Sequence, residues 1–253
     1  TAEINGGTFE VIQKYPDAAK ADEFVLNCND ANRKAGTAKI TVKGGKFINF
    51  NPADCWAEGE HTNFVAPGYV SIGKVDESGT VYYEVVKATD NVTSTADFIT
   101  ALNVNNSVIT VGQDITIDDY AMFFRKSQTV QLVGGASITA AATESQAIKV
   151  STKASLYVAG NGKIAGPSNV TSSERNVSGA IEVENAKIVN ISGNVTIEGG
   201  KNNILAYGKG SDAAVLVNGG TLNIFGGYFK SFKNNAGKAN PVIYLYGDAK
   251  VKA

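Results

Sequence analysis

The stretch of sequence that decides the fold is Thr221-Leu222-Asn223-Ile224-Phe225-Gly226-Gly227-Tyr228-Phe229. In this stretch an alternating strand runs into a Gly-Gly pair and then into a second, aromatic strand. The pattern recurs at Thr1–Phe9 and at Thr37–Phe47, with looser copies at Asn194–Gly200, Ala213–Gly220 and Thr129–Gly135. Copies of one short unit, each with a glycine corner, predict a repeat architecture built from strands.

The spacing of the Gly-Gly pairs indicates how these units are connected. Gly199 and Gly226 are 27 residues apart, and Gly6 and Gly44 are 38 residues apart, which is too long for simple hairpins. One turn of a β-solenoid, with two or three short strands between Gly and Asn corners, fits these intervals. A single turn cannot bury its apolar side chains, whereas turns stacked about 4.8 Å apart bury them and also pair the strand edges. We therefore predict an all-β parallel β-helix, with an antiparallel sandwich as the alternative.

The composition favours strands and excludes several classes of function. The 253 residues include 45 Val and Ile but only 8 Leu, a balance typical of strands rather than helices. With 23 basic and 24 acidic residues the formal net charge is −1, so no broad basic field can attract nucleic acid or anionic lipid. The apolar runs end after a few residues, and we expect a soluble chain with no membrane insertion.

Two segments predict the order of the parts. Thr95–Leu102 is predicted to be a short capping helix, begun by Ser94 or Thr95, that covers the open end of a solenoid core with Phe98, Ile99 and Leu102 on one face. Tyr69–Ile72 and Val81–Val86 flank a turn and predict a terminal hairpin. The predicted division is closing circuits and the terminal hairpin of a β-helix module at 1–88, a linker at 89–94, and the capping helix and opening circuits at 95–253.

The closing segment thus comes first, and the last residues of the chain resemble an unfinished circuit. Placing Thr1 after Ala253 completes it, because Asp248–Ala253 followed by Thr1–Phe9 parallels Ala213–Phe229. The Gly-Gly interval across this join is 33 residues, between the other two intervals. We expect one period of a longer array, or a permuted module, whose open ends stack on another copy of itself or on neighbouring modules.

A longer motif resembles a known family. It comprises Gly44-Gly45-Lys46-Phe47-Ile48-Asn49-Phe50-Asn51-Pro52-Ala53-Asp54, then Glu58-Gly59, then Thr62-Asn63-Phe64-Val65-Ala66-Pro67-Gly68-Tyr69. These residues resemble pectate-lyase-like right-handed parallel β-helix proteins of gut-bacterial surfaces and their phages, in which such a segment closes the helix. The resemblance is specific across Thr1–Ala88 and weaker from Thr95 onward, and the closing segment departs from the usual order by coming first. It implies a right-handed helix, an adhesin-type role and an extracellular, cell-surface or virion setting.

The sequence predicts no catalytic residue, metal or cofactor. A Ser-His-Asp or Cys-His arrangement would need the single histidine, His61, which lies in a polar loop and is expected to be solvated. Cys28, Cys55 and His61 lack the clustered spacing of a zinc site. The sequence leaves open whether the two cysteines form a disulfide.

One group of acidic and basic residues is a candidate for polysaccharide cleavage. Enzymes of the broader β-helix superfamily cleave polyuronides with aspartates and an arginine or lysine, or hydrolyse them with paired aspartates. The nearest match is Asp118-Asp119 with Arg125 and Lys126, and none of the family's catalytic signatures surrounds it. A solvated corner is the other interpretation of these residues.

The candidate binding residues are Asp54, Trp56, Glu58 and His61, in one polar loop. Sugars favour exposed aromatic faces with carboxylate neighbours, although Trp56 could equally plug the end of the core. We expect a non-enzymatic structural or adhesive β-helical protein, one period of a longer extracellular fibre or array. A carbohydrate-binding module, with glycans as partners, and a polysaccharide lyase or hydrolase are the alternatives.

Overall fold

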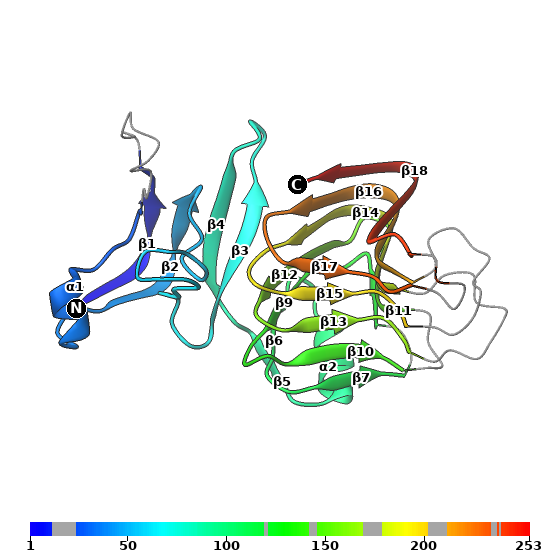
Figure 1. Cartoon of the computed structure of the whole chain (residues 1–253), viewed down its shortest axis with the longest axis horizontal. Helices are drawn as coiled ribbons and strands as arrows, with labels where there is room; N and C mark the ends of the chain where they lie inside the picture. The colour runs from blue at the N-terminus through cyan, green and yellow to red at the C-terminus, as the bar shows by residue number, and fades with distance from the viewer. Residues whose placement is uncertain are drawn as a thin grey trace. The chain divides into compact units, whose positions relative to one another are not determined.

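The computed structural model describes residues 1–11, 24–118, 121–141, 146–168, 179–201, 212–233, 237 and 239–253. The chain divides into two compact units, Thr1–Ala88 and Thr89–Ala253, which we call unit 1 and unit 2. The described residues are mostly in strands, and parallel sheets dominate unit 2 (Figure 1). Within these residues, neither helix is long and apolar enough to cross a bilayer.

Unit 1 is built on one four-stranded sheet in the order β1-β2-β4-β3 (Figure 1). The strands are β1 (Ala2–Phe9), β2 (Ile40–Ile48), β3 (Tyr69–Val75) and β4 (Val81–Lys87). β1 and β2 pair in parallel, with Thr8 opposite Lys46 and Phe9 opposite Phe47, as the two Gly-Gly motifs predict. The Phe9 and Phe47 rings stack with centroids 5.0 Å apart, and Phe47 is fully buried.

The predicted hairpin is present, and one helix of unit 1 was not predicted. β3 and β4 are antiparallel, and the Asp76 carboxylate accepts the N–H groups of Ser78 and Thr80 in the turn between them. The additional helix, α1 (Asp30–Lys34), begins where the Asn29 side chain accepts the N–H of Asn32. Its five residues are too few for an amphipathic pattern to reveal it.

In unit 2, the strands that lie next to each other in a sheet run parallel. One sheet has the order β17-β15-β13-β10-β7 and the other β18-β16-β14-β12-β9-β6-β5, with β11 beside β14 and β8. No antiparallel pair joins these named strands in the described part of the chain, which contradicts the sandwich alternative for this unit. The strands are β5 (Asp90–Val92), β6 (Val108–Val111), β7 (Ile115–Ile117), β8 (Ala121–Phe124), β9 (Gln128–Leu132), β10 (Ser137–Ala140), β11 (Gln146–Ser151), β12 (Ser155–Gly160), β13 (Lys163–Ala165), β14 (Gly179–Ile191), β15 (Thr196–Glu198), β16 (Ala213–Ile224), β17 (Tyr228–Lys230) and β18 (Ile243–Lys252).

The core of unit 2 lies between these sheets and is formed by aligned aliphatic side chains. The parallel register places isoleucines of successive strands next to one another, and each is at most 2 % exposed: Ile115, Ile138, Ile164 and Ile197. Inward positions therefore repeat from strand to strand. A β-branched side chain fits such a pleated, stacked surface, which explains the excess of Val and Ile.

The predicted capping helix is α2 (Thr95–Leu102), and it begins where the Ser94 hydroxyl accepts the Asp97 N–H. α2 packs against β5, β7 and β8 and buries Phe98 and Leu102. Ile99, which was predicted on the same face, is 38 % exposed. α2 thus covers one end of the core.

Two predictions are corrected by the strand pairs. Residues 89–94, predicted to be a linker, contain β5, which pairs with β6 and buries Val92 in the core. Gly199 is not the counterpart of Gly226: its N–H donates to the Lys230 carbonyl, and the corner next to Gly226 is Gly193. The interval between equivalent corners here is therefore 33 residues instead of 27.

Candidate functional site

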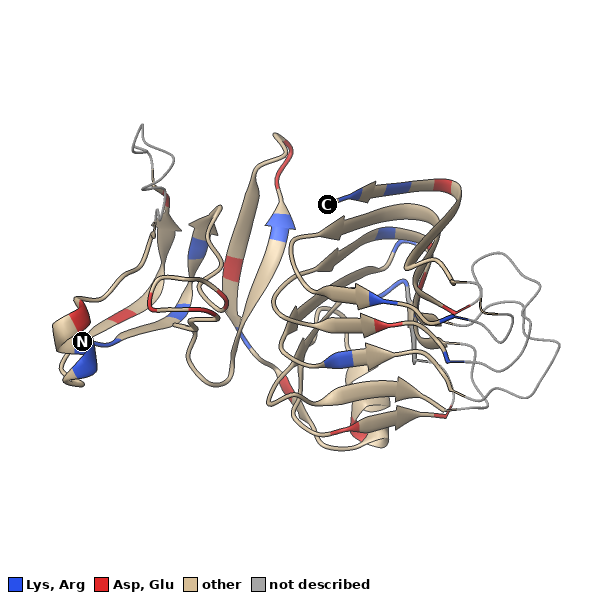
Figure 2. Cartoon of the chain, viewed as in Figure 1, with Lys and Arg blue, Asp and Glu red and all other residues tan. Residues whose placement is uncertain are grey.

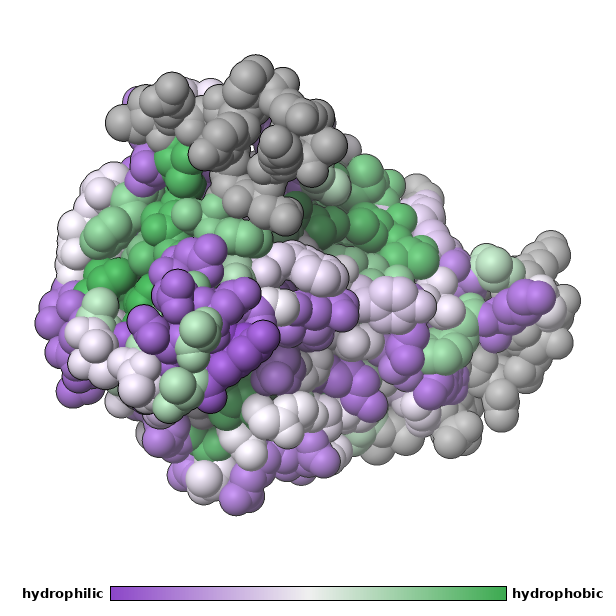
Figure 3. Space-filling view, turned by 60° about the vertical axis from the view of Figure 1, so that its left-hand side comes forward, coloured by the Kyte–Doolittle hydropathy of each residue, from purple (hydrophilic) through white to green (hydrophobic). Residues whose placement is uncertain are grey.

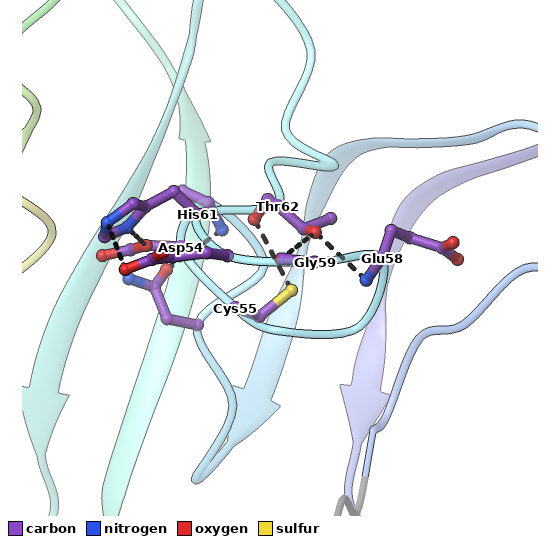
Figure 4. A network of polar contacts seen from close by, with 9 residues as sticks. Asp54, Cys55, Glu58, Gly59, His61 and Thr62 are labelled. Atoms are coloured by element: carbon purple, nitrogen blue, oxygen red, sulfur yellow. Dashed lines mark hydrogen bonds and ion pairs between the residues drawn. The ribbon is translucent and has the colours of Figure 1, made fainter.

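The predicted binding residues lie in a loop of unit 1 that is closed by hydrogen bonds (Figure 4). Cys55 and Thr62 form an antiparallel bridge in which each N–H donates to the other residue's carbonyl oxygen, at 3.0 and 2.8 Å. The Thr62 hydroxyl donates to the Gly59 carbonyl at 2.6 Å and accepts the Glu58 N–H at 3.1 Å. Gly59 and His61 have φ values of +111° and +59°, which allow the chain to reverse within this short bridge.

Asp54 and His61 are brought together in this loop. His61 Nδ1 lies 2.8 Å from Asp54 Oδ1, and Nε2 lies 3.5 Å from Glu60 Oε1. The hydrogen bond with Asp54 raises the pKa of His61, with smaller contributions from the two carboxylate charges. The side chain of His61 is 53 % exposed, in keeping with the solvated loop histidine that we expected. The pair fastens the loop but is open to water.

Glu58 and Trp56 do not join this pair. The Glu58 carboxylate lies 2.5 Å from Arg33 Nε of α1 and accepts the Cys28 N–H at 2.6 Å. It points away from Asp54 and His61 in Figure 4. Trp56 is 64 % exposed, so the alternative in which its ring plugs the core is wrong. Trp56 is thus an exposed aromatic residue in the loop that holds the Asp54–His61 pair.

The two cysteines are free thiols and do not form a disulfide. Burial raises the pKa of both Cys28 and Cys55, and the charge of the Glu58 carboxylate raises both further. Such thiols are poor nucleophiles near neutral pH. Within the part of the chain that the structure describes, no three His, Cys, Asp or Glu side chains are grouped to hold a metal ion.

The candidate residues for polysaccharide cleavage are exposed, lie outside the described residues or are bound elsewhere. Asp118 and Arg125 are exposed, and Asp119 lies outside the described residues. The Lys126 ammonium group donates to the Asn103 carbonyl, just beyond the C-terminal end of α2. A cation at this position donates a hydrogen bond to a carbonyl at the helix end and interacts favourably with the helix dipole. This is a structural role.

A charged cluster on unit 2 was missed by the sequence analysis. Lys149 Nζ lies 3.5 Å from Glu182 Oε1 and 2.9 Å from Glu184 Oε2, both on the neighbouring strand. Gln146 donates to Glu182 at 2.9 Å, and Ser151 donates to Glu184 at 3.2 Å. β11 and β14 pair Lys149 with Glu182 and Ser151 with Glu184, so the parallel register creates the cluster. Aligning the two segments at an interval of 33 residues would have found it.

The two carboxylates of this cluster have opposite pKa shifts. Burial raises the pKa of Glu182 in spite of Lys149, whereas the hydrogen bond from Lys149 lowers the pKa of Glu184. On β18, Tyr244 and Tyr246 continue the same rows, with ring centroids 6.1 Å apart. Burial, followed by the charges of both carboxylates, raises the pKa of Tyr246.

A second ion-pair group lies on the other sheet of unit 2. Glu198 on β15 is 2.8 Å from Lys230 on β17 and 2.9 Å from Lys201 (Figure 2). Burial alone would raise the pKa of Glu198, but the hydrogen bonds from the two lysines outweigh it and the pKa is lowered. Each cluster pairs opposite charges: one lysine with two carboxylates in the first, and one carboxylate with two lysines in the second.

The end of the core opposite α2 is not covered by the residues of unit 2 that the structure describes. Ile181 and Val215 pair in register and are fully buried, but Ile243, the next residue in this row, is only half-buried. Val251 likewise continues a row from fully buried Leu222 and is half-buried. β18 and β1 each occupy the outer position of their sheet, so each has one strand edge without a partner in the described part of the chain.

The surface alone does not single out one site. Figure 3 shows hydrophilic side chains at the front of the view, with hydrophobic patches on either side. Comparisons with known proteins add no assignment: no family model, no curated protein and no solved structure matches this chain.

Proposed function

We propose that this chain is a non-enzymatic structural or adhesive protein, a right-handed parallel β-helix that assembles end to end into a longer extracellular fibre. The observation that carries the proposal is the difference between the two ends of the unit 2 core. α2 covers one end, whereas β18 leaves inward positions such as Ile243 half-buried and Leu245 47 % exposed at the other.

An open end of this kind favours association for two reasons. Covering apolar surface is favourable by roughly 25 cal/mol per Å². An unpaired strand edge is also a template for another strand. A contact between two different ends repeats without closing and gives an open series. The extracellular, cell-surface or virion setting rests on the resemblance carried by residues 44–69.

Assembly is tested by sedimentation velocity and negative-stain electron microscopy over a wide range of protein concentrations. We expect elongated particles that grow with concentration. Leu245→Lys, which places a charge on the uncovered end, should keep the protein monomeric. Ile99→Lys is the matched control, because Ile99 is similarly exposed but lies on α2 at the covered end. A wild-type protein that remains monomeric throughout, or equal assembly of both variants, would contradict the proposal.

Carbohydrate binding is a second candidate, favoured by the exposure of Trp56. Trp56 is 64 % exposed in the same loop as Asp54 and His61, and aromatic faces bind the apolar faces of sugar rings. Glycan-array binding should be lost in Trp56→Ala and kept in Tyr228→Ala, because Tyr228 is equally exposed but lies in unit 2. Glycan binding that survives Trp56→Ala would exclude this loop as the site.

A further inference from the structure

We propose that the outer edge of β18 in one copy pairs in parallel with β1 of a second copy of this chain, with Glu3 facing Lys252. This inference rests on the proposed end-to-end assembly and names the strand that pairs with the C-terminal residues of β18. Each copy offers one β18 edge and one β1 edge. The contact therefore repeats head to tail.

β1 has the pattern of the strand that β18 already pairs with. On its inner side, β18 lies against β16, with Val251 opposite Leu222 and Lys252 opposite Asn223. Thr1–Phe9 repeats the pattern of Thr221–Phe229, so Ala2 corresponds to Leu222 and Glu3 to Asn223. On the outer edge of β18 the same register places Ala2 opposite Val251 and Glu3 opposite Lys252. β1 is itself parallel to β2, so a β1 strand paired in parallel with β18 would extend that sheet with further parallel strands.

The charges on the two edges are complementary. β18 ends with exposed Lys250 and Lys252 on either side of half-buried Val251 (Figure 2). Glu3 on β1 is 50 % exposed, and its carboxylate lies 2.6 Å from Lys43 on the β2 side. An ionised carboxylate has lone pairs for several donors, so Glu3 can hold Lys43 and also face a lysine on its outer side. Opposite charges on facing residues stabilise a strand pair, and like charges destabilise it.

The chain between β4 and β5 is too short for the same pairing within one chain. Six strand steps separate β18 from β5, about 29 Å at the spacing of neighbouring strands. If β1 lay on β18 of its own chain, β4 would be three steps farther out, about 43 Å from β5. Lys87 ends β4 and Asp90 begins β5, and three peptide units span at most about 11 Å. The β1 strand on β18 must therefore come from another copy.

The test is charge reversal on the full chain at low ionic strength, where exposed charges are least screened. In sedimentation velocity, Glu3→Lys should raise the concentration at which half of the protein is assembled by about tenfold or more, equivalent to about 1.4 kcal/mol. The triple variant Glu3→Lys, Lys250→Glu, Lys252→Glu should restore assembly. Lys43→Gln is the control, because it removes the ion-pair partner of Glu3 within unit 1 and leaves Glu3 in place.

A second measurement fixes the polarity. Glu3→Cys protein mixed with Lys252→Cys protein should form a disulfide-linked heterodimer, and neither variant alone should cross-link at the same rate. If the wild-type protein assembles but charge reversal has no effect and no heterodimer forms, the strand assignment is wrong and end-to-end assembly stands. If the wild-type protein does not assemble at all, both proposals fall.

Discussion

Val217 and Leu245 lie opposite each other in neighbouring parallel strands, yet Val217 is fully buried and the side chain of Leu245 is 47 % exposed. Val183, on the other side of Val217, is also fully buried. The three residues occupy one inward row, so the exposure of Leu245 comes from its place at the end of the row. One more strand beside β18 would be needed to bury Leu245.

The first prediction compares two leucines in this part of the fold. Leu222→Ala removes a fully buried side chain and should lower the free energy of unfolding by about 2–5 kcal/mol. Leu245→Ala removes a side chain that is already half in water, and we expect a loss of about 1 kcal/mol. Urea unfolding of dilute protein, below the concentration of assembly, measures both. Equal losses would mean that Leu245 is covered in the isolated molecule.

The sequence predicted those elements whose signals are local. The Ser94 cap and the spacing of Phe98 and Leu102 were sufficient for α2, and matching Gly-Gly motifs were sufficient for the β1–β2 register. It failed where a partner lies far along the chain. Nothing near Glu58 indicates that Arg33 will bind it, and the Lys149 cluster exists only once β11 and β14 are paired. Glycine pairs alone could not decide between Gly193 and Gly199 as the corner next to Gly226.

The second prediction concerns close approach of the backbone at a glycine. Gly160 has φ of +92°, and an added Cβ would collide with the Leu132 carbonyl oxygen on the neighbouring strand. Gly135 has φ of +79°, but an added Cβ would meet no atom within 4 Å. Gly135→Ala should therefore cost about 1–2 kcal/mol from backbone strain alone. Gly160→Ala should cost clearly more, because two paired strands must separate, and thermal unfolding of the two variants measures the difference.

The third prediction is a pH dependence of the Asp54–His61 loop. Because the pKa of His61 is raised above its usual 6.5, the pair stabilises the fold fully below pH 6.5 and loses this contribution as the pH rises through the raised value. In an NMR titration, the pKa of the His61 imidazole should return toward 6.5 in Asp54→Asn. Glu60→Gln should change it less, since Glu60 lies 3.5 Å away and Asp54 lies 2.8 Å away. A pKa unchanged by Asp54→Asn would show that the pair does not persist in solution.

The fourth prediction separates the two carboxylates that share Lys149. The raised pKa of Glu182 means that its contribution to stability is present below pH 4.5 and is lost as the pH rises through the folded value. The lowered pKa of Glu184 has the opposite sign: its contribution is present above pH 4.5 and is lost as the pH falls through the folded value. Near neutral pH, Glu182→Gln should be neutral or stabilising, because an amide is cheaper to bury than a carboxylate.

Glu184→Gln should instead destabilise the fold near neutral pH by about 0.5–1 kcal/mol, because Lys149 loses its nearer partner, and this cost should shrink in acid. Urea unfolding of the two variants and the wild type at several pH values gives both curves. Lys149→Met provides the control, because it removes the shared cation. In this background the effects of Glu182→Gln and Glu184→Gln on the free energy of unfolding should differ less. If Glu182→Gln were the more damaging change near neutral pH, the ion pair with Lys149 would outweigh the burial of Glu182, and the assignment of the two carboxylates would have to be reversed.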